Sequence, residues 1–108
     1  MEGYGKELEE TPDDEIEKVI DINILGYLYT MKYAFKAFKA RGGGAIIFVS
    51  SVGAILPRHM FLGDEGPMRT GVPYGVTKAA NDYTARIASA WAKDNIRTYG
   101  ILPGAFRT

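Results

Sequence analysis

Residues 45–51 read Ala45-Ile46-Ile47-Phe48-Val49-Ser50-Ser51, a continuous apolar run that stops at two serines. The run is largely β-branched and shows no alternation of polar and apolar positions. This pattern is typical of a strand that is covered on both faces in a parallel sheet. The sequence therefore predicts a buried strand over residues 45–49, with Ser50 and Ser51 at its carboxyl end.

A long helix is predicted before this strand. Residues 11–15, Thr-Pro-Asp-Asp-Glu, offer a hydroxyl for the N-cap, a proline at the first helical position and three carboxylates beside the positive helix end. Apolar residues then recur at steps of three or four as far as Phe38, and glycines 42–44 form a stop signal. We expect one helix over about residues 12–40. Further apolar side chains predict a second buried side, for example against another subunit; they are Ile22, Leu25, Tyr29 and Tyr33.

A second helix and a second strand are predicted in the C-terminal half. Apolar and small residues recur at helical spacing from Pro73, and residues 93–95, Lys-Asp-Asn, close the pattern. Residues 96–102 form a strand of mixed exposure that ends at Pro103-Gly104, and residues 52–73 form a long loop without a clear period. The order helix, strand, helix, strand predicts an α/β fold with a parallel sheet, in one domain over residues 1–108.

The composition argues against several classes of partner. Thirteen basic residues balance thirteen acidic ones, so no global field favours nucleic acid or an anionic membrane. The chain has no cysteine and a single histidine, His59, which argues against disulfides and a zinc site. It shows neither a signal peptide nor an apolar run approaching about 18 residues. We therefore expect a cytoplasmic protein without metal, membrane or nucleic acid as a partner.

The spacing of Tyr74 and Lys78 points to proton transfer. Residues four apart share a helix face, so the phenol and the ammonium would lie one turn from each other. A positive charge about 4 Å from a phenol is worth roughly 4 kcal/mol at an effective dielectric of about 20, enough to lower a phenol pKa of about 10 by about three units. The tyrosine could then act as an acid and a base near neutrality. The same spacing also arises by chance on surface helices, so its context decides.

That context is the carboxyl edge of the predicted sheet. Ligands of open parallel sheets bind outside the carboxyl ends of the strands, where Ser51 and Pro103-Gly104 both fall. A serine hydroxyl there can donate to a substrate oxygen, a tyrosine can move the proton, and a lysine can hold the phenolate and a cofactor hydroxyl. In outline, this is a site for redox chemistry between a carbonyl and an alcohol.

Four ordered motifs resemble the short-chain dehydrogenase/reductase family, which has an Asn in a long helix, a strand ending in Ser-Ser, a Tyr-x-x-x-Lys helix and an Ile-Arg strand closing in Pro-Gly. The resemblance covers nearly all of residues 11–108. The matching stretches are Asp21-Ile22-Asn23-Ile24-Leu25-Gly26, residues 44–53, Tyr74-Gly75-Val76-Thr77-Lys78-Ala79-Ala80, and residues 96–108 from Ile96-Arg97 to Pro103-Gly104-Ala105-Phe106-Arg107-Thr108.

The resemblance implies an NAD(P)-dependent oxidoreductase with a Rossmann-like fold that interconverts a small-molecule carbonyl and an alcohol by hydride transfer. Tyr74 would be the general acid/base. Lys78 would lower its pKa and contact the nicotinamide ribose, Ser51 would orient the substrate carbonyl, and Asn23 would hold a water in a proton relay toward Lys78. The resemblance also implies which residues line the nicotinamide end of NAD or NADP. They are Pro103, Gly104 and Thr108, together with Asn23, Tyr74 and Lys78.

The sequence also departs from the family pattern. Thr77 replaces the commoner serine, Tyr99-Gly100 replaces the usual asparagine, and the segment between Ser51 and Tyr74 is longer than usual. The resemblance therefore carries no substrate specificity through this segment. Relatives begin with a strand, a Gly-rich turn and a helix that hold the pyrophosphate, and residues 1–22 do not resemble them. Glycines 42–44 follow a helix and precede a strand, which is the reverse of a phosphate cradle.

We therefore expect a partial Rossmann-like domain that lacks the Gly-rich nucleotide-binding half and the C-terminal end. An alternative hypothesis is a truncated, catalytically silent chain that associates through its helices. Uncovered strand edges and apolar faces predict a homodimer or homotetramer through residues 12–40 and 73–93.

Each candidate residue also has a simpler interpretation. Tyr74 and Lys78 could be a surface pair, Ser51 a loop residue, and Asn23 a helix residue that bonds locally to the backbone. His59 is expected in an exposed loop. Trp91 and the tyrosines at 27, 29 and 33 are more often core or interface residues than cofactor contacts.

Overall fold

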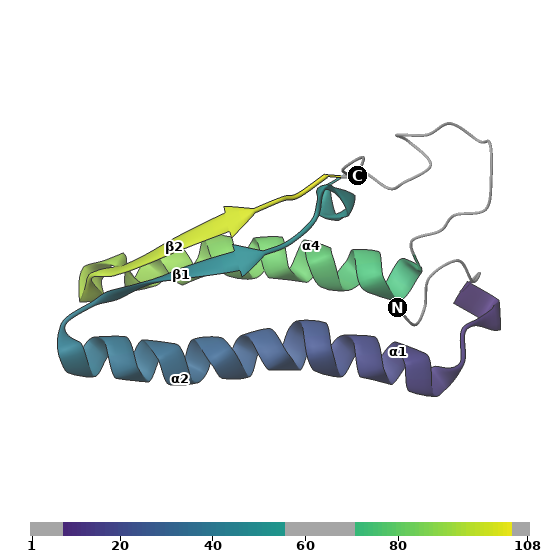
Figure 1. Ribbon diagram of the computed structural model, residues 1–108, viewed down its shortest axis with the longest axis horizontal. Helices are drawn as coiled ribbons and strands as arrows, with labels where there is room; N and C mark the ends of the chain where they lie inside the picture. The colour runs from purple at the N-terminus through teal and green to yellow at the C-terminus, as the bar shows by residue number, and fades with distance from the viewer. Residues whose placement is uncertain (1–7, 56–70, 105–108) are drawn as a thin grey trace.

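The computed structural model describes residues 8–55 and 71–104 (Figure 1). The chain forms the predicted order of helix, strand, helix and strand, with short helical turns between them. The elements are η1 (Leu8–Glu10), α1 (Asp13–Ile20), η2 (Asp21–Leu25), α2 (Gly26–Arg41), β1 (Gly44–Val49), η3 (Val52–Ala54), α4 (Val72–Ile87), η4 (Ala88–Asp94) and β2 (Ile96–Ile101).

The predicted N-terminal helix is present as three consecutive helical segments, α1, η2 and α2, which run on from one another (Figure 1). Pro12 occupies the N-cap position, where the sequence predicted Thr11, and makes no side-chain cap bond. The prediction was wrong here because the carbonyl oxygen of Pro12 already accepts from the N–H groups of Glu15 and Ile16. The helix therefore begins one residue later than expected.

The η2 segment is a π-helical turn that the sequence did not reveal. The N–H of Gly26 donates to the carbonyl oxygen of Asp21, five residues back. Such a turn widens the helix locally while the apolar periodicity on either side continues, so the hydrophobic pattern does not show it. Asn23 lies in the middle of this turn.

The helix stop at glycines 42–44 is confirmed. Gly42 has φ 90°, a left-handed conformation that favours glycine, and the N–H of Gly43 donates to the carbonyl oxygen of Phe38 at 2.8 Å. At the same end of the molecule Asn95, with φ 59°, closes η4 and donates from its amide to the carbonyl oxygen of Gly42 at 3.1 Å. The two turns that lead into the strands are thus fastened to each other.

The two strands pair in parallel, as predicted for an α/β fold. Their register runs from Gly44 opposite Ile96 to Val49 opposite Ile101. The connection between them passes through α4. Parallel pairing brings the carboxyl ends of both strands to one edge of the sheet.

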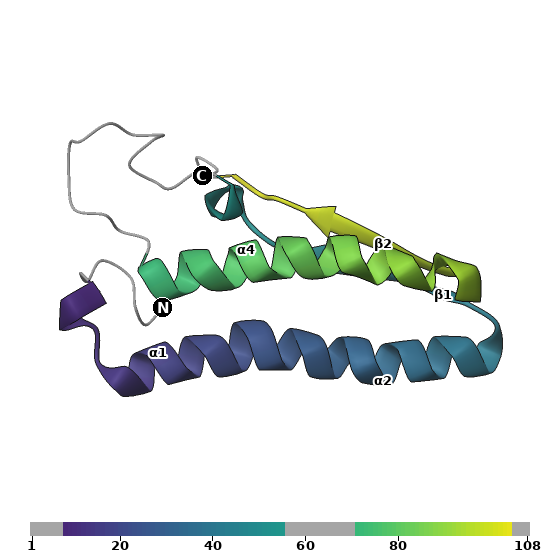
Figure 2. The ribbon, with the colours of Figure 1, turned by 180° about the vertical axis from the view of Figure 1, so that it is seen from behind.

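The prediction that β1 is covered on both faces is wrong for the described residues. The helices α2 and α4 lie on the same side of the two strands (Figures 1 and 2). The other face carries large apolar side chains that remain exposed, with Ile47 61% and Val49 45% accessible. The strand is uniformly apolar, but the described residues supply a covering layer on one side. The exposed face consists of Ile47, Val49, Tyr99 and Ile101.

The core lies between the helices and the inner face of the sheet. Its buried members are Phe35, Phe48, Ala85, Ala88 and Ile96. The Phe35 ring lies 5.3 Å from the Trp91 ring, measured between centroids, which places Trp91 against the core. Small residues allow α4 to approach β2 closely, since a Cβ built on Gly100 would stand 3.5 Å from that of Ala85. Core formation therefore fixes α4 against the sheet.

The second apolar side of the long helix is uncovered in the single chain. Tyr29 and Tyr33 are 57% and 64% exposed, and Ile22 is 59% exposed. Tyr83 and Val76 are similarly exposed on α4. The predicted second packing surface therefore remains a prediction about another subunit. Among the helices that the structure describes, none combines the length and the apolar character needed to cross a membrane.

Replacing either of two glycines by alanine should change the stability of the fold, in opposite directions. A Cβ on Gly44 would stand 2.3 Å from Cδ1 of Phe38, whereas a Cβ on Gly75 in α4 meets nothing within 4 Å. We expect Gly44→Ala to lower the free energy of unfolding by about 1–3 kcal/mol through overpacking. We expect Gly75→Ala to raise it by about 1 kcal/mol through helix propensity. Urea unfolding followed by circular dichroism measures both. An unchanged midpoint for Gly44→Ala would contradict the packing of Gly44 against Phe38, and a lowered midpoint for Gly75→Ala would contradict the open space beside Gly75.

Candidate active site

The carboxyl edge of the sheet brings the two predicted strand ends together. The N–H of Ser50 donates to the carbonyl oxygen of Ile101 at 2.9 Å, and the N–H of Val52 donates to that of Pro103 at 3.2 Å. Ser51 therefore lies beside Pro103 although 52 positions separate them in the sequence. Gly104 follows as an exposed residue, and a Cβ built on it would meet Cγ1 of Val52 at 4.0 Å. Thr108 and His59 lie outside the described residues.

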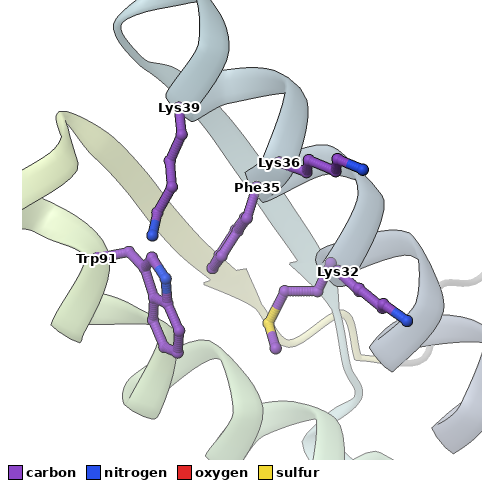
Figure 3. Close-up of a pocket in the computed structure, with 6 residues that line it drawn as sticks. Lys32, Phe35, Lys36, Lys39 and Trp91 are labelled. Carbon is purple, nitrogen blue, oxygen red and sulfur yellow. The ribbon is translucent and has the colours of Figure 1, made fainter.

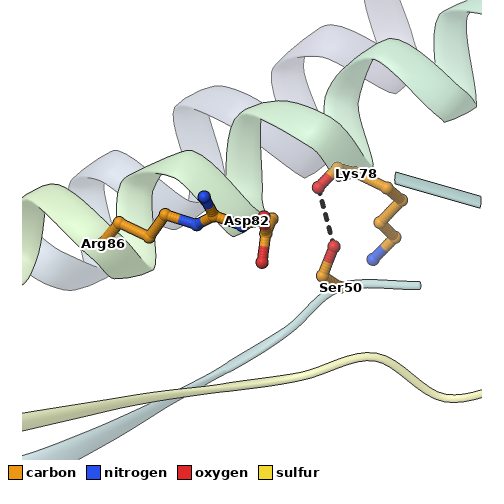
Figure 4. Close-up of polar contacts among 4 residues, drawn as sticks. All are labelled: Ser50, Lys78, Asp82 and Arg86. Carbon is orange, nitrogen blue, oxygen red and sulfur yellow. Dashed lines mark hydrogen bonds and ion pairs between the residues drawn. The ribbon is translucent and has the colours of Figure 1, made fainter. Parts of the chain in front are cut away.

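Ser50 fastens α4 to this edge. Its side chain is buried, and its hydroxyl donates to the backbone carbonyl oxygen of Lys78 at 2.7 Å (Figure 4). Helix interiors normally use such carbonyls for their own bonds, and a carbonyl oxygen has a second lone pair available. This bond fixes the position of the Lys78 backbone relative to the end of β1.

Lys78 is buried, with 9% of its surface exposed, and its side chain extends past the end of β1 (Figure 4). Its Nζ donates to the carbonyl oxygen of Val49 at 3.1 Å. Burial lowers the pKa of this ammonium from its ordinary value, because desolvation disfavours the charged form. Since an ammonium has three N–H donors, the bond to Val49 leaves two for other acceptors.

Tyr74 lies one turn before Lys78 on α4. The Nζ of Lys78 is 5.5 Å from the centroid of the Tyr74 ring. The shared helix face predicted from their spacing is therefore present, and the ammonium faces the aromatic ring. This arrangement places a cation beside the phenol in a site that is partly removed from water.

Ser51 caps the short helix η3. Its hydroxyl oxygen accepts from the N–H of Gly53 at 3.1 Å. A hydroxyl that accepts in this way still has its own proton to donate. The contact fixes the position of Oγ and leaves the O–H group able to donate to a ligand oxygen.

Asn23 connects the π-helical turn with α4 through Thr77. Its amide donates to Oγ1 of Thr77 at 3.1 Å, and the Thr77 hydroxyl donates to the backbone carbonyl oxygen of Tyr74 at 2.7 Å. Thr77 is fully buried. The threonine that stands in place of the family's commoner serine therefore links Asn23 to the turn that carries Tyr74.

Tyr27 is a site residue that the sequence reasoning missed. Its hydroxyl donates to the carbonyl oxygen of Val49, the same atom that Lys78 contacts, and the Lys78 Nζ is 5.6 Å from its ring centroid. Burial raises the pKa of Tyr27, and the neighbouring Tyr74 raises it further. The contact of Tyr27 with Val49 joins residues 22 positions apart, so no local sequence pattern indicated it.

A separate pocket of about 440 Å³ lies between α2 and η4 (Figure 3). Phe35 and Trp91 face each other across it, while Lys32 and Lys36 extend away from it (Figure 3). Its lining residues are Met31, Lys32, Phe35, Lys36, Lys39 and Trp91, and none of them belongs to the site at the sheet edge. The pocket therefore has no part in proton transfer at Tyr74.

Comparison with known proteins identifies the family of this chain. The sequence matches the short chain dehydrogenase family over residues 3–108. The chain belongs to this family. A tropinone reductase homolog of Arabidopsis thaliana is 33% identical over 100 residues. Among solved structures, the chain is similar to a gluconate 5-dehydrogenase from Burkholderia cenocepacia J2315 in complex with NADP and tartrate, at 27% identity and a TM-score of 0.79. It is also similar to a 4-hydroxyisoleucine dehydrogenase complexed with NADH and succinate, at 25% identity and a TM-score of 0.75.

The match covers most of this chain and a smaller part of each relative. It takes in 92% of the chain and 34% of the tropinone reductase homolog. It takes in 99% of the chain and 38% of the gluconate 5-dehydrogenase, and 94% of the chain and 44% of the 4-hydroxyisoleucine dehydrogenase. The chain therefore spans about a third of the length of the curated relative.

The buried ammonium of Lys78 predicts a specific dependence of stability on pH. Its pKa in the folded protein lies below the ordinary 10.5, so between those values the unfolded chain binds more protons than the folded one. The free energy of unfolding should therefore rise with pH in that window. We expect the stability of the wild-type protein, measured relative to Lys78→Met, to increase as the pH rises toward about 10.

Urea unfolding at a series of pH values checks this expectation. The range ends near pH 10, because the raised pKa of Tyr27 makes stability fall above the ordinary tyrosine value of 10.0. Lys93→Met, at an exposed lysine of η4, provides a control for the loss of one positive charge away from the sheet edge. A constant difference for Lys78→Met would contradict the burial of the ammonium.

Proposed function

We propose that this protein is an NAD(P)-dependent oxidoreductase that interconverts a carbonyl and an alcohol, with Tyr74 as general acid/base. The observation that carries the proposal is the buried Lys78 ammonium, 5.5 Å from the Tyr74 ring and bonded to Val49 through one donor. The bound NADP and NADH of the two similar dehydrogenases support the choice of cofactor class.

Tyr74 would deliver its proton to the carbonyl oxygen during reduction and accept a proton from the alcohol during oxidation. Lys78 would stabilise the phenolate that forms, because a cation in a desolvated site interacts strongly with a nearby anion. Proton transfer by a positioned side chain contributes roughly 10²–10⁴ to the rate. The contribution depends on the position of the ammonium, which Val49 holds.

Ser51 and Asn23 would complete the site. The Ser51 hydroxyl has its oxygen fixed by Gly53 and its proton available, so it would donate to the substrate oxygen. Asn23 fixes the Tyr74 turn through Thr77, and its proposed further role is to hold a water that passes protons toward Lys78.

The sheet edge fits the nicotinamide end of a dinucleotide. Lys78 has two N–H donors beyond its bond to Val49, which suits ribose hydroxyls, and Gly104 leaves the edge open because it has no side chain. Pro103 and Thr108 are the remaining proposed contacts of the cofactor. A bound nicotinamide would supply the hydride to the substrate carbon, or accept it from that carbon, while the residues of the chain move the proton.

Removal of the Tyr74 hydroxyl tests this function directly. We expect Tyr74→Phe to lower kcat/KM for a responsive ketone by at least about a hundredfold, because the proton donor is lost. We expect the Kd for NADPH or NADH to stay within about threefold, since the ring and Lys78 remain. The exposed Tyr83 on the same helix provides a matched control, and Tyr83→Phe should retain full activity.

Initial rates on a panel of small ketones and aldehydes, together with dinucleotide binding by fluorescence, provide the readout. Retention of reductase activity in Tyr74→Phe would contradict the assigned role. Absence of any dinucleotide binding by the wild-type protein would contradict the proposed function as a whole.

A second candidate role is association without turnover, and the exposed apolar side chains of α2 and α4 favour it. The same faces would form a homodimer or homotetramer of the active enzyme, so assembly alone does not separate the two roles. Dinucleotide affinity separates them, because the silent role predicts an oligomer that binds neither NADH nor NADPH.

If the exposed apolar faces of α2 and α4 form the interface, a charge placed there should disrupt the oligomer. We expect Tyr33→Lys to lower the native mass toward that of a single chain, because it places a charge in an apolar interface. Multi-angle light scattering gives the mass. If association used the uncovered sheet face instead, Ile47→Lys would be the disruptive change and Tyr33→Lys would leave the mass unchanged.

A further inference from the structure

The ring of Tyr27 is held in place by the core. It stacks on Phe48 with 6.0 Å between ring centroids and 26° between ring planes. Phe48 is 2% exposed and belongs to the core cluster, so its ring has little freedom to move. The position of Tyr27 is therefore set by the same packing that fixes α2 on β1.

The Lys78 ammonium has contacts from three elements. The ring of Tyr27 on α2 and the ring of Tyr74 on α4 lie at nearly equal distances from Nζ, 5.6 and 5.5 Å to their centroids. The end of β1 provides the Val49 carbonyl, to which both the Tyr27 hydroxyl and Nζ donate. Among the residues that the structure describes, the titratable side chains that face the ammonium are thus the two tyrosines.

We propose that Tyr27 is a positioning residue for Lys78: its ring holds the ammonium beside Tyr74, and its hydroxyl shares the Val49 carbonyl with the ammonium. This inference rests on the proposed function, since it gives Tyr27 a part in the same site. Tyr27 itself is not a second acid, because its hydroxyl proton is engaged with Val49.

The aromatic ring of Tyr27 offsets part of the free-energy cost of removing the Lys78 ammonium from water. A cation over an aromatic face is worth more where water is excluded, and Lys78 is 9% exposed. The two rings near Nζ favour the charged form of the side chain and its position at the sheet edge. Loss of the Tyr27 ring would leave the ammonium with one aromatic contact and the bond to Val49.

The hydroxyl serves a different purpose. A carbonyl oxygen has two lone pairs, and here two donors use them. Because the Tyr27 hydroxyl uses one lone pair of the Val49 oxygen, Nζ is confined to the other, which would direct its two remaining N–H groups toward a hydroxyl of the dinucleotide. Without the Tyr27 hydroxyl, Nζ could use either lone pair of the Val49 oxygen, and this loss of a fixed position would weaken the binding of the dinucleotide.

The titration of Lys78 tests the role of the ring without requiring activity. Protein labelled with ¹⁵N-lysine is titrated by NMR in the wild type, Tyr27→Leu, Tyr27→Phe and the control Tyr29→Phe, whose tyrosine is exposed. We expect the Lys78 midpoint to fall by about half to one pH unit in Tyr27→Leu, because the cation–π contact is lost. Tyr27→Phe keeps the ring and should shift by less than about 0.3 unit, and Tyr29→Phe should not shift.

The role of the hydroxyl is tested by dinucleotide binding. Tyr27→Phe should raise the Kd for NADPH or NADH about fivefold, which is about the effect of one hydrogen bond. Thermal unfolding identifies any variant that fails to fold. If Tyr27→Leu does not fold, the test uses Tyr27→Phe, which keeps the packing on Phe48.

Equal Lys78 midpoints in the wild type and Tyr27→Leu would overturn the inference, whatever the activity of the protein. An unchanged Kd in Tyr27→Phe would overturn the part assigned to the hydroxyl. Failure of the proposed function has a different signature: the wild-type protein would bind no dinucleotide, while the Lys78 midpoint would still respond to Tyr27→Leu.

Discussion

The carbonyl oxygen of Val49 is the atom on which the site depends. It ends β1, and it accepts from the Tyr27 hydroxyl of α2 and from the Lys78 Nζ of α4. One residue further along, Ser50 donates to the backbone carbonyl of Lys78, so α4 is joined to the strand end at both its backbone and its side chain. Because Tyr74 precedes Lys78 by one turn, these contacts also determine where its phenol lies. Core packing of Phe48 against Tyr27 makes this arrangement a consequence of folding.

The buried face of α4 is unusually polar for a helix that packs on a sheet. Its buried polar residues are Thr77, Lys78, Asn81 and Thr84, and the amide Nδ2 of Asn81 has no hydrogen-bond partner among the residues that the structure describes. Burial of such groups costs free energy unless they are bonded, and most of them are bonded to a backbone carbonyl. Residues that lower the stability of a fold tend to lie at its functional sites. The polar face therefore supports a site at this position.

Much of the fold could be predicted from local sequence patterns. The strand ending in Ser50-Ser51, the stop at Gly42 and the shared face of Tyr74 and Lys78 each depend on residues within a few positions of one another. Tyr27 could not be identified in the same way, because its bond to Val49 joins residues 22 positions apart. The π-helical turn at Asn23 left the apolar period unchanged, and the exposed face of β1 depends on which layers surround the strand. Contacts between distant elements are therefore where the sequence alone was insufficient.

The central claim is that the site at the sheet edge carries a redox reaction in which the chain moves a proton and the dinucleotide moves a hydride. Incubation with a responsive ketone and NADPH or NADH deuterated at the transferring C4 position measures this most directly, with mass spectrometry of the alcohol. We expect an alcohol heavier by about one mass unit, with deuterium at the carbinol carbon. An alcohol without deuterium at that carbon, or no alcohol with either dinucleotide, would contradict the claim.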